Sequence, residues 1–440
     1  MTGIHPYAAM LRERLRNMLI GCARVSKADD SQSLDLQPHL APAIHVAVFV
    51  AFWRAPIDIV LFALYLGYGL ALLLIAPDKS HGHEENAMKL TMKIAAIFFS
   101  TISPMLIAHY SAAASEFVGV REIVASSKER GRDLRVTIWY PADAGGKPVT
   151  LGESTFFVGT DAMLDAPISR GKYPLILLSH GAGLGGTPQA MSWIAAPLAQ
   201  QGFIVAAPTH PGNTGANKSA AETMKLWLRP ADISATLDVV EKYPPFENHL
   251  EAGRVGALGL SMGGNTALAL AGARIDPIRL ASYCDTDDFN TSLCGWVRQS
   301  GVDLHAMDMR LAGRDNKDKR IEFVMAIDPA PVDIFQMDTF SKVSIPVDIV
   351  NLGQSGTIPQ TTLASGIAKA IPKGTYSTIE DASHYSMFGE CKPDADKLAD
   401  SEKIGDPICS DGGGRSRLEI HRRLIAMATE AFSRALKPVD

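Results

Sequence analysis

A short motif in the middle of the chain limits both its fold and its chemistry. Residues 259–263 read GLSMG and stand between an apolar segment at 254–258 and an alanine-rich segment at 264–271. The first segment predicts a buried strand and the second a helix. A G-x-S-x-G turn between them is too tight for side chains at its glycines, and it lifts the serine hydroxyl clear of the sheet. Ser261 is therefore the candidate nucleophile, with an ordinary glycine-rich turn as the alternative.

Apolar strands alternate with helical stretches along the rest of the chain. Strands are expected at 118–125 and 134–140 as an antiparallel pair, then at 175–179, 204–208, 255–259, 323–327, 347–351 and 375–379, before a closing helix at 418–436. Such alternation predicts a mostly parallel sheet with helices on both faces. Together with the serine turn, it predicts the α/β-hydrolase fold. Residues 274–320 have weak periodicity and are interpreted as a small lid insertion.

A serine nucleophile needs a base and an acid that orients the base. In this fold they follow the serine in the order acid, then histidine. His384, in a polar loop after the last predicted strand, is the candidate base, and a solvated loop histidine is the alternative. Asp328 ends an apolar strand and is the candidate acid. Asp381 is the second choice for the acid, because it is so close to His384 in the chain that a role in shaping the loop suits it better. Asp348 lies inside a strand, where its side chain would not reach the strand's carboxyl end.

A glycine-rich loop follows the predicted strand at 175–179, where residues 180–186 read HGAGLGG. An H-G-x-G turn after a strand is typical of loops whose backbone N–H groups face a developing oxyanion. We expect the N–H groups of Ala182 and Met262 to form this oxyanion hole. A phosphate-binding loop is disfavoured, because no Lys-Ser/Thr pair follows the glycines and the spacing differs from G-x-G-x-x-G.

Other polar residues near these motifs suit supporting roles. His180 belongs to the oxyanion loop, and His210 follows an earlier strand and is expected to line the pocket. His421 lies in the closing helix and is expected to be structural. Arg229 could bind a substrate carboxylate, but an ion pair with Asp232 or another neighbour is favoured.

Charge and cysteine content narrow the class of protein. A formal net charge of −5 over 440 residues gives no reason to expect a nucleic-acid partner. The sequence has no cofactor motif or metal-ligand cluster, so no cofactor is expected. Four of the five cysteines fall into the local pairs Cys284/Cys294 and Cys391/Cys409, which predict two disulfides in an oxidising compartment. Four free thiols in a cytosolic enzyme are the alternative.

The N-terminal part carries two apolar runs. Residues 59–76 are long enough to cross a membrane, and 94–108 form a shorter run. The lysines before the second run and the small residues after it are typical of a signal peptide cleaved after Ala114. The chain is therefore divided into a hydrophobic extension at 1–87, a signal-peptide-like segment at 88–114 and a catalytic domain at 115–440.

Two explanations of the extension stay open. Either translation begins at Met88 or Met92 and residues 1–87 are an overextended gene model, or the two runs form a membrane anchor. The arginines before the first run favour a cytoplasmic location for that end of the chain. Export of the catalytic domain through the second run would instead place that end outside. This conflict disfavours the anchor and favours the later start. In both cases we expect the catalytic domain outside the cytoplasm, either periplasmic or secreted.

From about residue 117 onward, the chain resembles bacterial proteins described as predicted dienelactone hydrolases and the related platelet-activating-factor acetylhydrolases. The likeness rests on residues 136–141, 179–183, 259–264, 326–328 and 383–384. The resemblance to the acetylhydrolases implies a triad acid at Asp328 and an oxyanion donor at Ala182. Dienelactone hydrolases have a cysteine nucleophile where this chain has Ser261, which disfavours an enol-lactone substrate.

The sequence thus predicts an exported serine hydrolase that cleaves carboxylic esters with a small or medium acyl group. In this hypothesis Ser261 attacks the carbonyl, His384 takes the proton and Asp328 orients the imidazole. The expected partner is a small-molecule ester, and any membrane association would come from the N-terminal runs. The alternatives are an amidase or peptidase with the same triad and a non-catalytic, membrane-anchored scaffold with a hydrolase-like fold.

Overall fold

A computed structural model describes residues 115–214 and 217–437 of the chain. The predicted extension at 1–87, the signal-peptide-like segment at 88–114 and both apolar runs lie outside these residues and stay predictions. Within the described ranges, none of the helices combines the length and the apolar character that crossing a membrane requires.

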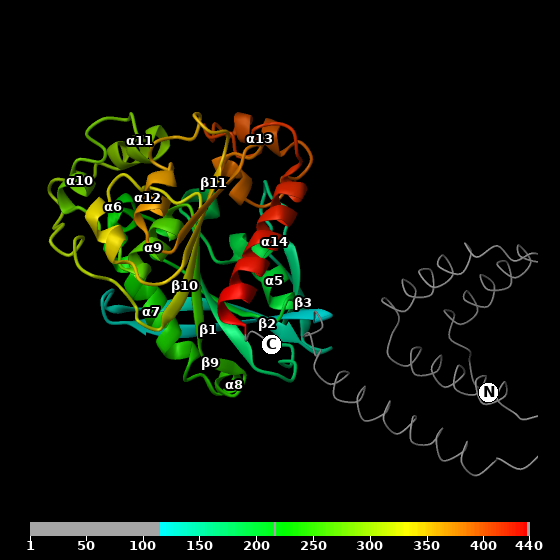
Figure 1. The fold of residues 1–440 in the computed structure, drawn as a ribbon. Coiled ribbons are helices and arrows are strands. Elements are labelled where there is room, and N and C mark those ends of the chain that lie inside the picture. Colours follow the sequence, from blue (N-terminus) through cyan, green and yellow to red (C-terminus); the bar gives the residue numbers. More distant parts are fainter. Residues whose placement is uncertain (1–114, 215–216, 438–440) are drawn as a thin grey trace, which may run out of the picture. The chain divides into compact units, whose positions relative to one another are not determined.

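In the described part of the chain, ten strands form one sheet in the order β12-β11-β10-β9-β5-β6-β2-β1-β4-β3 (Figure 1). Neighbours from β6 to β12 run parallel, while β2 pairs antiparallel with both β1 and β6. A separate two-stranded sheet joins β7 and β8. The strands are β1 (Phe117–Ser127), β2 (Arg132–Ala142), β3 (Lys147–Leu151), β4 (Thr160–Leu164), β5 (Tyr173–Ser179), β6 (Ile204–Pro208), β7 (Asn213–Thr214), β8 (Asn217–Lys218), β9 (Leu250–Leu260), β10 (Ile321–Ile327), β11 (Val347–Leu352) and β12 (Gly374–Ile379).

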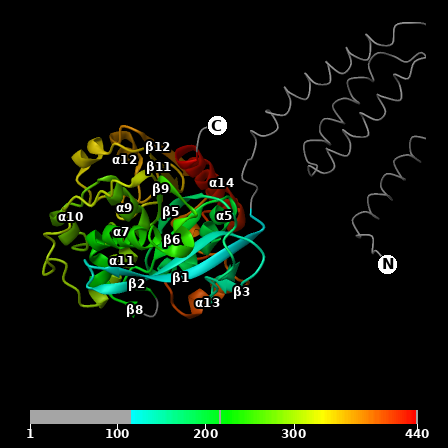
Figure 2. The same ribbon diagram turned by 90° about the horizontal axis from the view of Figure 1, so that it is seen from below.

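Helices cover both faces of the sheet. α7 and α9 lie on one side, and α5 and α14 lie on the other (Figures 1 and 2). The buried apolar side chains divide in the same way into one core under α7 and α9 and another under α5 and α14. The helices are α5 (Ser192–Gln200), α6 (Ala220–Met224), α7 (Arg229–Val240), α8 (Pro244–Glu247), α9 (Met262–Ala271), α10 (Pro277–Ala281), α11 (Thr291–Gln299), α12 (Ser365–Ala370), α13 (Ala395–Ser401) and α14 (Arg417–Leu436), with 3₁₀ turns η1 (Gly183–Gly185), η2 (Gln189–Met191), η3 (Leu226–Leu228), η4 (Met337–Lys342) and η5 (His384–Met387).

The central strands are apolar runs because helices cover them on both sides. Every residue of β5 and of β6 is buried. The opening antiparallel pair, the six later strands and the closing helix confirm the sequence prediction, although β9 begins earlier, at Leu250. The sequence pattern does not predict β3 and β4. β3 is largely exposed and β4 is mostly half-buried, and both extend the sheet beyond β1, so they carry little apolar signal.

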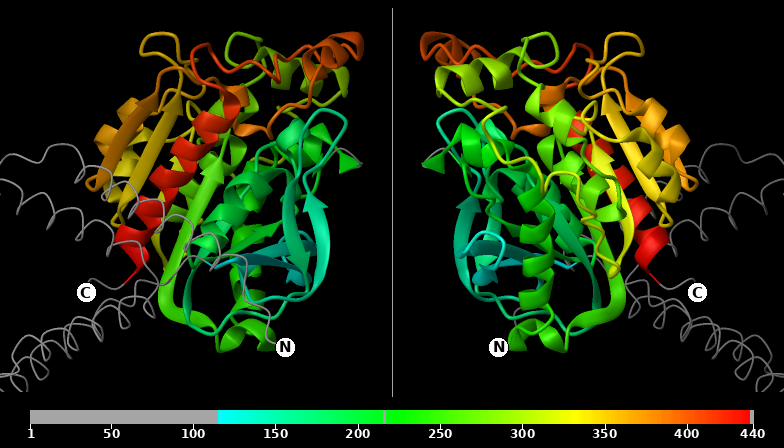
Figure 3. Two further views of the ribbon diagram at one scale, coloured as in Figure 1. Left: turned by 90° about the vertical axis from the view of Figure 1, so that its right-hand side faces the viewer. Right: turned by 90° about the vertical axis from the view of Figure 1, so that its left-hand side faces the viewer.

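The segment at 274–320, predicted as a lid, contains the short helices α10 and α11 joined by turns. The predicted pair Cys284 and Cys294 is bonded within it. Ser292 in α11 donates a hydrogen bond of 2.9 Å to Asp406, in the loop after α13. Both views of Figure 3 place α11 and α13 at the same end of the domain. The two segments therefore support each other there, and the action of 274–320 as a lid stays a prediction.

Phe432 in α14 tests the packing of the second core. Its ring is fully buried and lies 5.0 Å, centroid to centroid, from the ring of Phe323 in β10. We expect Phe432→Ala to lower the free energy of unfolding by about 3–5 kcal/mol, because it leaves a cavity. Phe289→Ala removes the same ring from a residue that is 39% exposed and should cost less than about 1 kcal/mol. Urea titration measures both, and equal losses would contradict this packing.

Candidate active site

Ser261 lies between β9 and α9 on a strained turn. Its backbone has φ 54° and ψ −121°, a conformation that residues with a side chain rarely adopt. A Cβ atom on Gly259 would stand 2.0 Å from the carbonyl oxygen of Gly263, and one on Gly263 would stand 1.8 Å from the carbonyl oxygen of Ser179. Both glycines of the motif are therefore required by close backbone contact, and the strand–turn–helix order confirms the local prediction.

The structure brings Ser261, His384 and Asp328 together. His384 Nε2 lies 3.0 Å from Ser261 Oγ, and His384 Nδ1 lies 2.6 Å from Asp328 Oδ2. The Asp328 side chain is 1% exposed and that of His384 is 30% exposed. The histidine therefore joins a buried carboxylate to the hydroxyl of a half-buried serine at the end of β9.

Asp328 is fixed by the neighbouring strand β11. Its Oδ1 accepts hydrogen bonds from Asn351 Nδ2 over 2.7 Å and from the Leu352 backbone N–H over 2.9 Å. Asn351 also donates to the carbonyl of Thr362 over 2.8 Å, so it ties the acid to the loop that follows. Sequence reasoning missed this asparagine. The only signal was a polar residue at the buried end of an apolar strand.

The two other acids considered from the sequence point elsewhere. Asp381 forms an ion pair of 3.0 Å with Arg415. Asp348 accepts a hydrogen bond from Thr375 and pairs with Arg434 over 2.8 Å. Asp381 therefore shapes the loop of His384 from outside, as expected, and Asp348 lies away from the histidine.

The loop that carries His384 is held by buried aromatic and polar contacts. Trp193 Nε1 donates to the carbonyl of Met387 over 3.0 Å, and His421 Nε2 donates to the carbonyl of Ser386 over 2.9 Å. The rings of Trp193 and His421 stack with centroids 3.7 Å apart. His421 is thus structural, as the sequence predicts. The bonded pair Cys391–Cys409 lies just after this loop.

The H-G-x-G loop packs against the serine turn. Gly181 follows β5, and a Cβ atom on it would stand 3.4 Å from Ser261 Cβ. Ala182 comes next in this loop, while Met262 is the first residue of α9. The loop therefore lies against the serine turn at Gly181, and the N–H groups of Ala182 and Met262 stay predicted donors.

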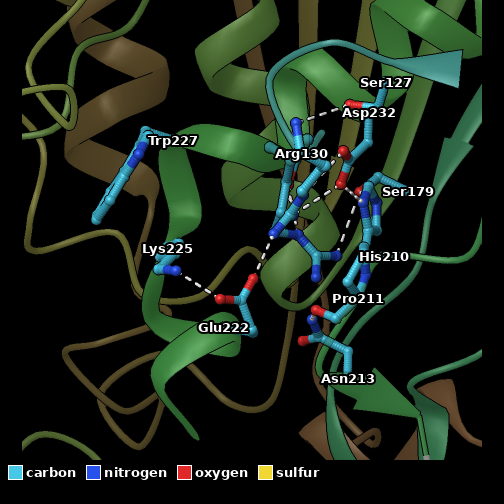
Figure 4. Close-up of polar contacts among 12 residues, drawn as sticks. Ser127, Arg130, Ser179, His210, Pro211, Asn213, Glu222, Lys225, Trp227 and Asp232 are labelled. Carbon is cyan, nitrogen blue, oxygen red and sulfur yellow. Dashed lines mark hydrogen bonds and ion pairs between the residues drawn. The ribbon is translucent and has the colours of Figure 1, made fainter. Parts of the chain in front are cut away.

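A second Ser-His-Asp set lies beneath this loop (Figure 4). His210 Nε2 lies 2.9 Å from Ser179 Oγ, and His210 Nδ1 lies 2.8 Å from Asp232 Oδ2. All three residues are buried, so no substrate can reach this serine. The expectation that His210 lines the pocket is therefore wrong, because the ring turns inward to Asp232.

The charged partner of Asp232 also differs from the expectation. Arg130 donates to both carboxylate oxygens of Asp232, from Nε over 3.0 Å and from Nη2 over 2.8 Å. Arg229 instead donates to Thr266 and to the carbonyl of His180. Sequence reasoning missed Arg130, which lies in the charged turn between the first two strands and is far from Asp232 in the chain.

The two buried histidines are neutral. Burial, followed by the charges of His210 and Arg229, lowers the pKa of His180 well below 6.5. Burial, followed by the charges of Arg229 and Arg130, does the same for His210. His180 Nε2 accepts a hydrogen bond from the His210 backbone N–H over 3.1 Å, so its proton resides on Nδ1 and faces the carbonyl of Gly181. Within residues 115–214 and 217–437, no group of three His, Cys, Asp or Glu side chains could hold a metal ion.

We predict that the protein loses stability in acid. Burial lowers the pKa of His421 from 6.5 to about 4, and the pKa values of His180 and His210 are also lowered. The unfolded chain therefore binds more protons than the folded chain below pH 6.5, so the free energy of unfolding falls as the pH decreases from 6.5 towards 4. For His421 alone the loss is about 3 kcal/mol.

Urea unfolding at a series of pH values measures this slope. His421→Gln can still donate to the carbonyl of Ser386 but does not titrate, so it should flatten the slope between pH 6.5 and 4. A variant with the slope of the wild type would contradict a buried, neutral His421.

Comparison with known proteins supports the fold. The sequence model of the family described as platelet-activating factor acetylhydrolase, isoform II, matches residues 148–227, which include the H-G-x-G loop but not Ser261. The chain is similar to a ferulic acid esterase from Streptomyces cinnamoneus, with a TM-score of 0.50 and 18% identity over 74% of this chain and 92% of that one. A dienelactone hydrolase from Anabaena variabilis is less similar, with a TM-score of 0.39 and 13% identity over 72% of this chain and 97% of that one. No curated protein matches the sequence. The chain thus has the α/β-hydrolase fold, and over residues 148–227 it resembles the platelet-activating factor acetylhydrolases of isoform II.

Proposed function

We propose that the protein is a serine esterase in which Ser261 is the nucleophile, His384 the general base and Asp328 the orienting acid. The observation that carries this proposal is the series from Ser261 through His384 to Asp328, with distances of 3.0 Å and 2.6 Å. Ser261 also stands on a strained strand-to-helix turn at the end of the sheet, where it is half-buried. The buried Ser179 set has no such access.

In the proposed reaction, Ser261 Oγ attacks the ester carbonyl carbon while its proton moves to His384 Nε2. Asp328 accepts the hydrogen bond from Nδ1–H and stabilises the imidazolium. When the tetrahedral intermediate collapses, the bond to the alcohol oxygen breaks and His384 gives its proton to that oxygen. A water molecule then attacks the acyl-enzyme with the same base, which releases the carboxylic acid and restores Ser261.

We assign the oxyanion hole to the N–H groups of Ala182 and Met262. Ala182 belongs to the loop that packs on the serine turn. Met262 begins α9, where the positive end of the helix dipole favours negative charge. Preorganised donors of this kind are among the largest catalytic contributions, and the loss of one typically lowers kcat by about 10²–10³-fold.

The proposed substrates are carboxylic esters with a small or medium acyl group. The local match to a platelet-activating factor acetylhydrolase family supports ester chemistry, as does the fold likeness to an enzyme titled a ferulic acid esterase.

Substitution of the proposed acid and nucleophile tests these roles. With 4-nitrophenyl acetate as the probe, we expect Ser261→Ala to lower kcat by about 10⁴-fold or more. Asp328→Asn keeps the shape of the acid but stabilises the wrong tautomer of His384, so a fall of about 10⁴-fold is expected. Asp381→Asn is the matched control and should keep most of the activity, because Asp381 contacts Arg415. Equal losses in the two aspartate variants would contradict the assignment.

A fluorophosphonate probe, which reacts with an activated serine, tests the nucleophile independently. We expect an adduct on the wild type that is absent from Ser261→Ala. Folded wild-type protein without an adduct would favour the non-catalytic scaffold. Faster cleavage of an anilide than of the ester with the same acyl group would favour an amidase or peptidase.

We also infer that the catalytic domain acts outside the cytoplasm, in the periplasm or as a secreted protein. The bonds Cys284–Cys294 and Cys391–Cys409 support this inference, because disulfides persist in oxidising compartments. The sequence at 88–114 has the charge and apolar pattern of an export signal. A membrane anchor built from the two apolar runs is the alternative, with the same compartment for the catalytic domain.

The intact mass of the natively exported protein tests both the signal and the disulfides. We expect a chain that starts near Ser115 and is lighter by four hydrogens, since each disulfide removes two. Treatment with a reductant should restore those four hydrogens. A mass that includes residues 1–87 would contradict the later start and favour the anchor.

A further inference from the structure

A buried arginine connects the two elements that carry the proposed oxyanion donors. Arg229, the first residue of α7, is 1% exposed. Its Nη2 donates to the backbone carbonyl of His180, and its Nε donates to Thr266 Oγ1 over 3.0 Å. Thr266 Oγ1 in turn donates to the backbone carbonyl of Met262 over 3.1 Å. One guanidinium thus reaches the H-G-x-G loop directly and the first turn of α9 through one hydroxyl.

These bonds end next to both proposed donors. The carbonyl of His180 belongs to the peptide just before Gly181, one residue ahead of the Ala182 N–H. The carbonyl at the other end belongs to Met262 itself, whose N–H is the second proposed donor. A shift of either peptide would therefore change the distance between the two N–H groups.

We propose that Arg229 is a positioning residue that fixes the spacing of the Ala182 and Met262 N–H groups. The inference rests on the proposed function, because it assigns Arg229 to the oxyanion hole of that reaction. Hydrogen bonds from a charged donor to a carbonyl are stronger than those between neutral groups, which suits a contact that must hold a loop still.

The carboxylates near Arg229 are paired with other groups. Asp232, one turn further along α7, accepts two hydrogen bonds from Arg130, and Glu222 accepts another from Arg130 over 3.2 Å (Figure 4). Glu222 also pairs with the Lys225 ammonium, so both carboxylates have cationic partners other than Arg229. Arg130 thus occupies the carboxylate of Asp232, which leaves Arg229 free to donate to the loop and to Thr266.

The proton positions of the network follow from the same contacts. The Asp232 carboxylate can only accept from His210 Nδ1, so Nε2 is left to accept the proton of Ser179 Oγ. The Ser179 oxygen then accepts from Arg229 Nη2 over 3.4 Å. Each hydrogen bond in this series therefore has one defined donor and one defined acceptor. This keeps the strand end at Ser179 and the adjoining loop in a single arrangement.

A purely structural role for Arg229 is the competing explanation. Its Nη1 is buried without a hydrogen-bond partner in the described residues, and burial lowers its pKa to about 9. The buried charge therefore costs stability, and replacing such a charge by an apolar side chain of similar volume is often neutral or stabilising. Removal of the charge should therefore lower activity without lowering the stability of the fold.

The test compares Arg229→Met with the wild type on 4-nitrophenyl acetate, using the full chain. We expect kcat to fall by about tenfold to a hundredfold with little change in KM, because the hole acts on the transition state. A trifluoromethyl ketone, which forms a tetrahedral adduct with a serine, should bind more weakly by a similar factor. Arg229→Lys keeps the charge and a donor but not the planar fork, so it should recover only part of kcat.

A pair of threonine variants gives a matched control. Thr266→Val removes the hydroxyl between Arg229 and Met262 and should lower kcat by about twofold to tenfold, the effect of one hydrogen bond. Thr236 is equally buried and donates to the carbonyl of Asp232 over 2.8 Å, also four residues earlier in a helix. Thr236→Val should therefore leave kcat unchanged.

The outcomes separate this inference from the proposed function. If the wild type neither hydrolyses the ester nor reacts with the fluorophosphonate, the proposed function itself is wrong. If the wild type is active and folded Arg229→Met keeps its full kcat, the positioning role is wrong. If Arg229→Met does not fold, the threonine pair decides, and equal kcat in Thr266→Val and Thr236→Val would overturn the inference.

Discussion

The turn at Ser261 is the constraint on which the rest of the site depends. A residue with a side chain at φ 54° stores strain of about 1–3 kcal/mol, which the surrounding structure must hold. Here the Ser261 N–H donates to the carbonyl of Ile327, and the Ser261 carbonyl accepts from the Ala330 N–H, both over 3.0 Å. The end of β10 and the loop after it therefore hold Ser261, the proposed nucleophile, in place. Because Asp328 lies between Ile327 and Ala330, the same contacts fix the distance from serine to acid.

Asp328 and His384 of the proposed triad are each held by elements other than their own. Asn351 and the Leu352 N–H from β11 orient Asp328, whose own backbone has φ 42°. His384 lies in a loop whose carbonyls accept from Trp193 in α5 and His421 in α14. The site is thus rigid only when the sheet, α5 and α14 are packed together, which links the folding of the second core to the geometry of the proposed triad.

The sequence predicted the fold because its signals are local. The GLSMG turn and the apolar runs of the parallel strands depend on neighbours in the chain. β3, an exposed edge strand, and β4, a short half-buried strand beside it, were missed because they carry little apolar pattern. The candidate residues Ser261, Asp328 and His384 follow strands, so the parallel topology brings them to one edge of the sheet. Contacts between distant segments had no such signal: Arg130 and Asp232 are 102 residues apart.

The two Ser-His-Asp sets show why residue identity alone does not define a site of this kind. Their hydrogen-bond distances are alike, yet the charged neighbours of the two carboxylates differ. Asp232 is already paired with Arg130, and burial, followed by the charges of Arg229 and Arg130, lowers the pKa of His210. Besides His384, the partners of Asp328 are the neutral amides of Asn351 and Leu352, so its full negative charge remains to stabilise an imidazolium. The buried set of Ser179, His210 and Asp232 therefore suits fixed hydrogen bonds. The set in which Ser261 and His384 are partly exposed suits proton transfer.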